Sequence, residues 1–154
     1  MSTYQRGARL GQHFLTARWA ATMLANAAGV APGVTVVEIG PGKGALTGEL
    51  LRLGGTVIAI EKDGALVTKL KETFAKELEE GRLIIYESDI RDVTPETLGL
   101  ESKPYVLAAN IPYYITGEII RQFLTTTHQP QTMALLIQKE VAQRITSKKE
   151  SILS

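Results

Sequence analysis

Cysteine is absent from the 154-residue chain, and its two histidines, His13 and His128, lie far apart. Without cysteine there are no disulfides and no thiolate ligands, and two distant histidines do not form a metal-binding pattern. No apolar run approaches the roughly 18 residues of a membrane span, and the basic N-terminus lacks the apolar core of a signal peptide. We therefore expect a cytoplasmic protein without a bound metal. The net charge of +1 neither requires nor excludes a nucleic-acid partner, because the distribution of charge matters more than its sum.

The composition is that of a globular protein, with 44% hydrophobic and 21% charged residues, and we expect residues 1–154 to form one domain. Five apolar or β-branched segments are typical of strands: 34–39, 55–60, 82–86, 105–109 and 132–138. Segments typical of helices alternate with them: 18–28, 45–53, 64–80, 116–126 and 139–146. This alternation predicts an α/β fold, in which a mostly parallel, doubly wound, Rossmann-like sheet has helices on both faces.

The spacing of apolar residues also predicts which helix faces are buried. Trp19, Met23 and Ala27 follow one another at intervals of four, so we expect this face of the first helix to lie in the core. A similar apolar stripe over 64–80, with Lys and Glu opposite, predicts one continuous helix. Thr116 is expected to cap the N-terminus of the helix that follows the fourth strand.

Polar and glycine residues follow the predicted strands at positions that would meet at one edge of the sheet. The first strand runs into the glycine-rich loop 40–44, which precedes a helix, as in nucleotide-binding folds. Glu61 ends the second strand 21 residues after Gly40, the spacing at which an acid reaches ribose hydroxyls. Asp89 follows the third strand and Asn110 the fourth. In a parallel sheet these residues would line one crevice.

The fourth strand leads into Asn110, Ile111, Pro112 and Tyr113. Proline lacks an N–H group and disfavours the helical region at the preceding residue, so the Ile111 carbonyl is expected to face outward beside the Asn110 amide. Two acceptors beside an aromatic ring suit the exocyclic amino group of a nucleobase. The alternative is purely structural: a strand-to-helix turn with a capping Asn and a core Tyr.

Two nucleotide ligands fit this crevice from the residues alone. The loop and the following Ala45 match the G-x-G-x-x-(G/A) pattern of dinucleotide-binding dehydrogenases. A dehydrogenase also needs a group for hydride chemistry, and neither histidine is predicted to lie in the crevice. A methyltransferase that uses S-adenosyl-L-methionine needs mainly alignment, because the sulfonium is already a good leaving group. Asn110 and the Ile111 carbonyl are suited to provide that alignment.

Four segments resemble the ribosomal RNA adenine N6-dimethyltransferases, a family of class I methyltransferases. They are Leu-Gly-Gln-His-Phe-Leu at 10–15, Glu-Ile-Gly-Pro-Gly-Lys-Gly at 38–44, Asn-Ile-Pro-Tyr-Tyr-Ile-Thr at 110–116 and Gln-Lys-Glu-Val-Ala-Gln-Arg at 138–144. The proline of the loop and the segment at 138–144 favour the small-subunit (16S) branch, which acts in ribosome biogenesis. The macrolide-resistance branch, which modifies large-subunit RNA, is the alternative. A third possibility is a module that binds nucleotide or RNA without turnover.

The resemblance implies a role for each matching residue. Seven would bind S-adenosyl-L-methionine: His13, Leu15, Gly40, Gly42, Glu61, Asp89 and Asn110. Glu61 would hold the ribose hydroxyls, and Asp89 the adenine amino group. Four would be catalytic: Asn110, Ile111, Pro112 and Tyr113. The amide and the Ile111 carbonyl would hold the target adenine N6, while Tyr113 would stack on a base that has left the RNA stack.

The chain also departs from the family pattern. His13 stands where Asn is common, and an imidazole can donate a similar hydrogen bond. Family members have seven strands followed by a helical RNA-binding domain, so the chain resembles the N-terminal part of that architecture. We therefore expect small-subunit ribosomal RNA as the partner. We also expect the fifth strand to be an exposed sheet edge, which could pair with another chain.

Overall fold

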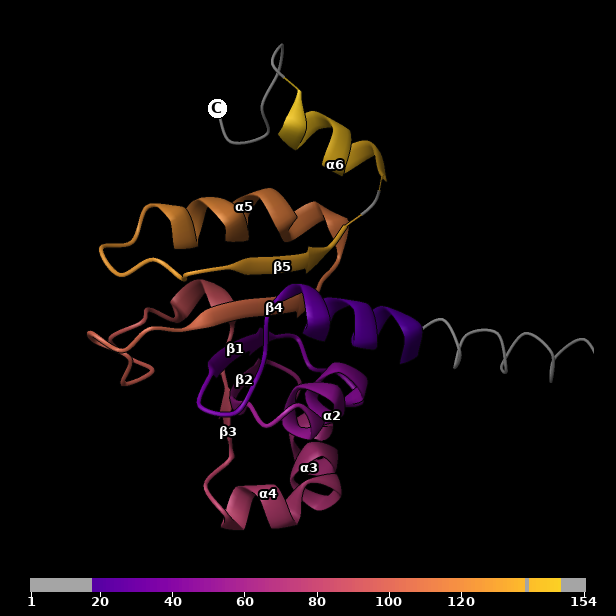
Figure 1. The fold of residues 1–154 in the computed structure, drawn as a ribbon, viewed down its shortest axis with the longest axis vertical. Coiled ribbons are helices and arrows are strands. Elements are labelled where there is room, and N and C mark those ends of the chain that lie inside the picture. Colours follow the sequence, from indigo (N-terminus) through magenta and orange to yellow (C-terminus); the bar gives the residue numbers. More distant parts are fainter. Residues whose placement is uncertain (1–17, 138, 148–154) are drawn as a thin grey trace, which may run out of the picture.

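The computed structural model describes residues 18–137 and 139–147. Within them, one parallel sheet has the strand order β3-β2-β1-β4-β5, with helices on both sides (Figure 1). The strands are β1 (Thr35–Ile39), β2 (Thr56–Glu61), β3 (Leu83–Glu87), β4 (Val106–Asn110) and β5 (Met133–Leu136). A helix over 18–27 precedes α2 (Ala45–Arg52), α3 (Gly64–Thr73), α4 (Ala75–Glu79), the 3-10 turn η1 (Ile90–Asp92), α5 (Tyr113–Leu124) and α6 (Lys139–Thr146). The predicted α/β fold is confirmed.

The central strands are buried on both faces because neighbouring residues of a strand point to opposite sides. Val36 belongs to a hydrophobic cluster that includes residues of the helix 18–27 and of α2. Val37, the next residue of β1, belongs to a second cluster formed with residues of η1 and α5. Two separate cores therefore hold helices against the two faces of the sheet. This arrangement explains why these strands appear in the sequence as nearly continuous apolar runs.

The strand order reverses between β1 and β4. The chain proceeds from β1 to β2 and β3 in one direction, and β4 and β5 are then added on the other side of β1. In the register of the sheet, Ile39 lies opposite Ile60 on one side and Ala109 on the other, so three strands end at the same level. Ligands of open α/β sheets bind at such a switch point, beyond the carboxyl ends of the strands. The loops after β1, β2 and β4 meet there.

The predicted burial of the first helix was wrong. Trp19 is 64% exposed, Met23 is 40% exposed, and Ala27 is also exposed. The buried face is instead formed by small residues and one leucine: Ala20, Ala21, Leu24, Ala25 and Ala28. Alanine lets a helix backbone approach the sheet closely. Because the segment is apolar almost all round, its periodicity did not identify the face that packs.

Two helix boundaries also differ from the sequence prediction. The expected helix over 64–80 is interrupted at Phe74, whose φ of −112° and ψ of 32° end α3 and begin α4. The helix α5 begins at Tyr113, directly after Pro112, which takes an extended conformation as its N-cap. Thr116 therefore lies inside the helix and not at its cap. It is fully buried, and its hydroxyl donates to the Pro112 carbonyl at 3.3 Å.

Strands β3 and β5 form the two edges of the sheet in the described part of the chain. The fifth strand is thus an edge, as predicted, and pairing of that edge with another chain stays a prediction. Among residues 18–137 and 139–147, no helix has both the length and the apolar character needed to cross a membrane.

Candidate active site

The loop after β1 is held against the end of β2. The Gly40 N–H donates to the Ile60 carbonyl, and the Gly44 N–H donates to the Pro41 carbonyl, each at 2.9 Å. Gly44 has a φ of 94° and immediately precedes α2. A Cβ at Gly44 would lie 2.6 Å from the ring of Phe74. This turn therefore requires glycine, both for its left-handed backbone and for its close packing.

Glu61, the last residue of β2, is tied to this loop. Its side chain is buried, and its Oε1 accepts a hydrogen bond from the Gly42 N–H at 3.2 Å. Its Oε2 accepts from the Asp63 N–H at 3.1 Å. An ionised carboxylate has about four acceptor positions, so these two bonds fix its orientation and leave others for hydroxyl groups. The carboxylate that the sequence assigns to ribose binding is therefore preorganised.

Glu38, on β1 just before the loop, is a buried acid that the sequence analysis did not assign. Its side chain is fully buried, and its Oε2 accepts a hydrogen bond from the Thr47 hydroxyl at 2.6 Å. Its Oε1 has no hydrogen-bond partner in the described part of the chain. Burial raises the pKa of Glu38 to about 8, and the nearby charge of Glu61 contributes in the same direction, although the Thr47 bond opposes the rise.

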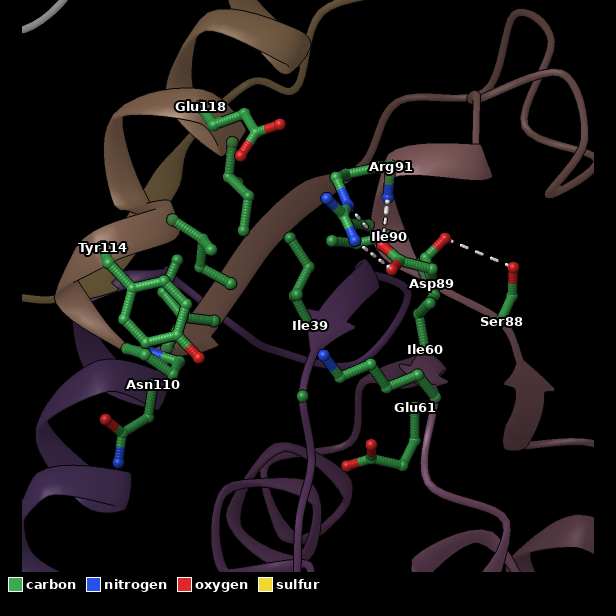
Figure 2. A pocket seen from close by; sticks show the side chains of 16 residues that line it. Ile39, Ile60, Glu61, Ser88, Asp89, Ile90, Arg91, Asn110, Tyr114 and Glu118 are labelled. Carbon is green, nitrogen blue, oxygen red and sulfur yellow. Dashed lines mark hydrogen bonds and ion pairs between the residues drawn. The ribbon is translucent and has the colours of Figure 1, made fainter.

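A cavity of about 490 Å³ opens beyond the ends of β1, β2 and β4 (Figure 2). Its walls include four isoleucines contributed by four different segments: Ile39, Ile60, Ile90 and Ile119. Glu61, Asp89 and Asn110 also line it, as the sequence predicted for one crevice. Apolar walls with a few polar groups at the edge suit a flat, heteroaromatic ligand such as a nucleobase with its sugar.

A second, smaller cavity of about 280 Å³ lies along the loop after β1. Its walls come from the helix 18–27, from Glu38, from the loop residues Gly40 and Gly42, and from Asn110. Gly40 and Asn110 line both cavities, so the two cavities adjoin at the ends of β1 and β4. A ligand made of two parts could place one part in each cavity, with its junction beside Asn110.

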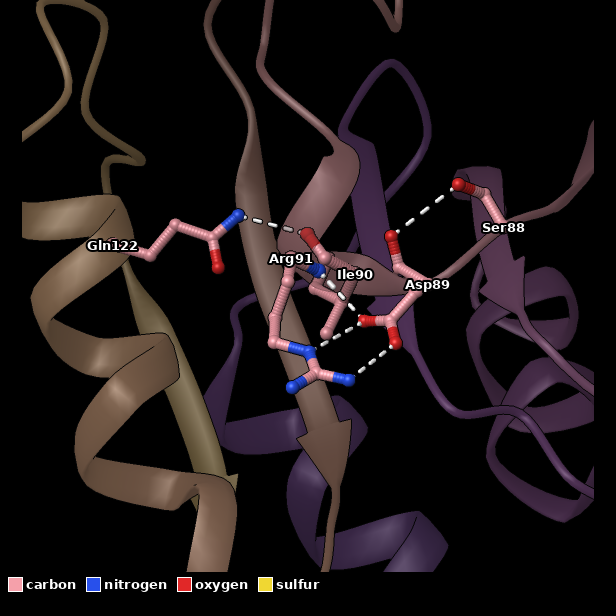
Figure 3. A network of polar contacts seen from close by, with 5 residues as sticks. All are labelled: Ser88, Asp89, Ile90, Arg91 and Gln122. Carbon is pink, nitrogen blue, oxygen red and sulfur yellow. Dashed lines mark hydrogen bonds and ion pairs between the residues drawn. The ribbon is translucent and has the colours of Figure 1, made fainter.

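The Asp89 carboxylate is engaged by Arg91 in the larger cavity (Figure 3). Its Oδ1 accepts from the backbone N–H of Arg91 at 3.0 Å and from the Arg91 Nε at 3.1 Å. Its Oδ2 accepts from the Arg91 Nη2 at 2.8 Å. The hydrogen bonds from Arg91 hold the pKa of Asp89 well below its usual range. Asp89 also caps η1, so the carboxylate that the sequence assigns to the adenine amino group is ionised and fixed.

The segment after β4 closes the larger cavity. Asn110 is exposed at the end of the strand, whereas Ile111 is buried and Pro112 turns the chain into α5. The backbone of Tyr113 begins α5, and its side chain is not among those that the structure describes. Tyr114, 72% exposed, also borders the cavity (Figure 2). A polar amide, a rigid turn and an exposed aromatic ring are thus gathered at the point where the cavities adjoin.

The predicted site residues that line these two cavities are Gly40, Gly42, Glu61, Asp89, Asn110, Ile111 and Pro112. His13 and Leu15 lie outside the described residues. The sequence analysis missed Glu38 and Arg91. Glu38 could have been noticed as a carboxylate within an otherwise apolar buried strand. Arg91 had no sequence signal beyond its position two residues after Asp89. Within the described segments, no group of three or more His, Cys, Asp or Glu residues is placed to hold a metal ion.

The model of the family described as ribosomal RNA adenine dimethylase matches residues 5–154. The chain belongs to this family. Curated relatives include the ribosomal RNA small subunit methyltransferase A of Dehalococcoides mccartyi (strain CBDB1), 46% identical over 139 residues, and that of Caulobacter vibrioides, 40% identical over 135 residues. These alignments cover 90% and 88% of this chain and 47% and 51% of the relatives. The chain therefore spans about half the length of the curated relatives it matches.

Solved structures agree with this assignment. A dimethyladenosine transferase from Plasmodium falciparum superposes with a TM-score of 0.64 at 30% identity, over 81% of this chain and 43% of that one. The 23S rRNA methyltransferase ErmE superposes with a TM-score of 0.67 at 27% identity, over 82% and 48% of the two chains. Membership of this methyltransferase family removes the dehydrogenase interpretation of the glycine loop. Because ErmE is described as a 23S rRNA methyltransferase, large-subunit RNA stays the alternative substrate.

Proposed function

We propose that this chain binds S-adenosyl-L-methionine across the two adjoining cavities. We further propose that it forms the catalytic part of an enzyme that dimethylates adenine N6 in small-subunit ribosomal RNA. The observation that carries the proposal is that Gly40 and Asn110 line both cavities. The donor consists of an adenosine and an amino acid joined at one sulfur. Binding across the cavities puts that junction beside Asn110.

The residues of the larger cavity suit the adenosine part. Glu61 keeps acceptor positions for two ribose hydroxyls while the Gly42 and Asp63 N–H groups hold it in place. Asp89 accepts from the adenine amino group. The isoleucine walls stabilise the base by apolar contact.

The smaller cavity suits the amino-acid part, because it contains a buried acceptor without a partner. Glu38, whose Oε1 is fully buried, is one of the residues that line this cavity, together with Gly40 and Gly42. A buried carboxyl group without a counter-charge is costly when ionised. The donor's ammonium group supplies that counter-charge and a hydrogen-bond donor, so Glu38 becomes ionised when the ammonium binds.

Catalysis by the chain's own residues is mainly alignment of the acceptor nitrogen. When bound, the donor supplies a methyl group on a sulfonium that leaves readily. Asn110 and the Ile111 carbonyl accept the hydrogens of the target N6, which turns its lone pair out of the ring plane. Pro112 fixes the turn that places these acceptors, and Tyr113 stacks on the target base. His13 and Leu15 complete the donor site from the N-terminal arm.

Methyl transfer from a labelled donor tests this function. Unmodified small-subunit ribosomal RNA and large-subunit ribosomal RNA are compared as substrates, each free and in its immature particle. We expect label in small-subunit adenine only, and in Asn110→Ala a loss of transfer that exceeds the loss of donor binding. Label in large-subunit RNA would establish the alternative. Donor binding without transfer to any RNA would instead make the chain a non-catalytic binding module.

A further inference from the structure

We propose that Arg91 is a positioning residue that leaves the Asp89 carboxylate one acceptor position toward the larger cavity and thereby selects a 6-aminopurine. This inference rests on the proposed function, because it requires the purine of the methyl donor to meet Asp89. Arg91 itself lies at the rim of the cavity and points across the carboxylate (Figure 2).

The acceptor positions of Asp89 can be counted. An ionised carboxylate has about four, two on each oxygen. On Oδ1, the Arg91 backbone N–H at 3.0 Å and Nε at 3.1 Å fill both. On Oδ2, the Arg91 Nη2 at 2.8 Å fills one. A single position on Oδ2 remains, so the carboxylate offers one hydrogen-bond acceptor in one direction.

The backbone around this pair is fixed from the opposite wall of the cavity. The Gln122 amide, on α5, donates to the Ile90 carbonyl at 2.9 Å (Figure 3). It also donates to the Val93 carbonyl at 3.0 Å. These bonds hold η1, which carries Arg91, at a set distance from α5. The fork of the guanidinium adds bidentate geometry that a lysine does not provide. Asp89 is therefore held by its own turn, by Arg91 and, through η1, by α5.

Chemical discrimination follows from this arrangement. A 6-amino group donates a hydrogen bond to the remaining Oδ2 position, whereas a 6-oxo group presents a second acceptor and repels the carboxylate. A carboxylate that rotates freely can turn an oxygen toward the N1–H group that a 6-oxo purine carries, and it then tolerates either purine. Arg91 prevents this because its two side-chain hydrogen bonds pin the orientation of the carboxylate, and the same bonds favour its ionised form.

Other charged groups near the pair do not reproduce this effect. Lys62, after β2, favours the ionised form of Asp89, but more weakly than Arg91 does. Glu118 on α5 and Asp92 of η1 act on Arg91 and favour its charged form. Arg91 has a matched counterpart in Arg52, which pairs with Glu49 Oε2 at 2.8 Å on α2, away from both cavities.

The test compares S-adenosylhomocysteine with its deaminated analogue S-inosylhomocysteine, in which a 6-oxo group replaces the 6-amino group and N1 carries a hydrogen. Their dissociation constants are measured by calorimetry at pH 7.5 and pH 5 for the wild-type chain, Arg91→Ala, Arg91→Lys and the control Arg52→Ala. We expect the wild-type chain to prefer the adenosyl ligand by about tenfold or more at both pH values. Arg91→Ala should lose most of this preference at both pH values. Arg91→Lys should lie between them.

The outcomes separate this inference from the proposed function. If the wild-type chain binds S-adenosylhomocysteine and Arg91→Ala keeps the full preference at both pH values, the role of Arg91 is wrong and the donor site stands. If the wild-type chain binds neither ligand, the proposed function fails and the inference fails with it. A merely structural role predicts equal weakening of both ligands, with an unchanged ratio, and would also overturn it. Arg91→Lys provides the same comparison if Arg91→Ala does not fold.

Discussion

The Gly42 N–H donates to the Glu61 carboxylate at 3.2 Å, which joins the loop after β1 to the end of β2. One residue belongs to the proposed methionine site and the other to the proposed ribose site. The bond therefore couples the two adjoining cavities through the backbone. A ligand that engages Glu61 also finds the glycine loop in its binding position.

Substitution of Glu61 tests this coupling. In the wild type, two backbone N–H groups each donate to an oxygen of the Glu61 carboxylate. In Glu61→Gln, one of them would face an NH₂ group instead. We expect donor binding to weaken by about tenfold or more and the free energy of unfolding to fall by about 1–2 kcal/mol. Calorimetry and thermal unfolding measure the two effects. Glu87→Gln is the control, because Glu87 is the neighbour of Glu61 in the sheet and lines neither cavity. Equal effects of the two substitutions would argue against a specific role.

The buried carboxyl group of Glu38 predicts a pH-dependent stability. Below pH 4.5 the group is protonated in both the folded and the unfolded chain, so it does not make the free energy of unfolding depend on pH. Between pH 4.5 and about 8 it ionises only in the unfolded chain, so the free energy of unfolding falls as the pH rises. Glu38→Gln keeps an acceptor for Thr47 and removes this penalty. The free energy of unfolding of Glu38→Gln should exceed that of the wild type, and the difference should grow to a few kcal/mol by pH 8.

Thermal or urea unfolding at pH 5 and pH 8 measures that difference. Glu79→Gln changes an exposed carboxylate on α4. Its difference in stability from the wild type should be the same at pH 5 and pH 8. A Glu38→Gln chain that is less stable than the wild type at pH 8 would show that Glu38 is ionised and well compensated in the folded state.

Donor binding should release a proton. Because the pKa of Glu38 is raised to about 8, the group is protonated in the empty chain at pH 7, and an arriving ammonium group favours its ionised form. The affinity for S-adenosyl-L-methionine should therefore rise with pH up to about 8, by no more than about tenfold per pH unit. Calorimetry in buffers of different ionisation enthalpy counts the released proton. The Glu38→Gln variant should release none, and equal release from both would assign the proton to another group.

Alanine substitutions at Gly44, in the loop after β1, and at Gly81, outside it, should differ in their effect on stability. Gly44 and Gly81 both have a positive φ, of 94° and 74°, so alanine costs each about 1 kcal/mol of backbone strain. Only at Gly44 does the added Cβ meet a neighbour, the Phe74 ring at 2.6 Å. Gly44→Ala should therefore lower the free energy of unfolding by at least 1 kcal/mol more than Gly81→Ala.

A double substitution isolates the clash. Phe74→Leu in the Gly44→Ala background should recover part of the lost stability, although it destabilises the wild-type chain. Urea unfolding of the four chains gives the coupling between the two positions. Additive effects would show that the alanine methyl group is accommodated without displacing the ring.

The sequence was sufficient for the fold and for the residues at the strand ends. Strands buried on both faces are apolar runs, and a parallel sheet brings the residues after β1, β2, β3 and β4 to one edge. Glu61 and Asp89 could be predicted because their positions follow from topology alone. The role that each plays toward a ligand stays a proposal.

Features that depend on side-chain packing could not be predicted. An alanine-rich helix has no clear polar face, so the exposure of Trp19 was missed. The helix is interrupted at Phe74, whose ring packs near Gly44, and helical periodicity does not record such a contact. The pairing of Arg91 with Asp89 depends on a local turn. The free oxygen of Glu38 depends on where the Thr47 hydroxyl points.

A calorimetric titration tests most directly whether one donor molecule occupies both cavities. S-adenosyl-L-methionine and NAD are titrated into the wild-type chain, into Asp89→Ala in the larger cavity and into Glu38→Gln in the smaller one. We predict one bound S-adenosyl-L-methionine per chain, no binding of NAD, and weaker donor binding in both variants. Binding of NAD without S-adenosyl-L-methionine would contradict the donor site. Donor binding that neither substitution weakens would place the ligand elsewhere on the chain.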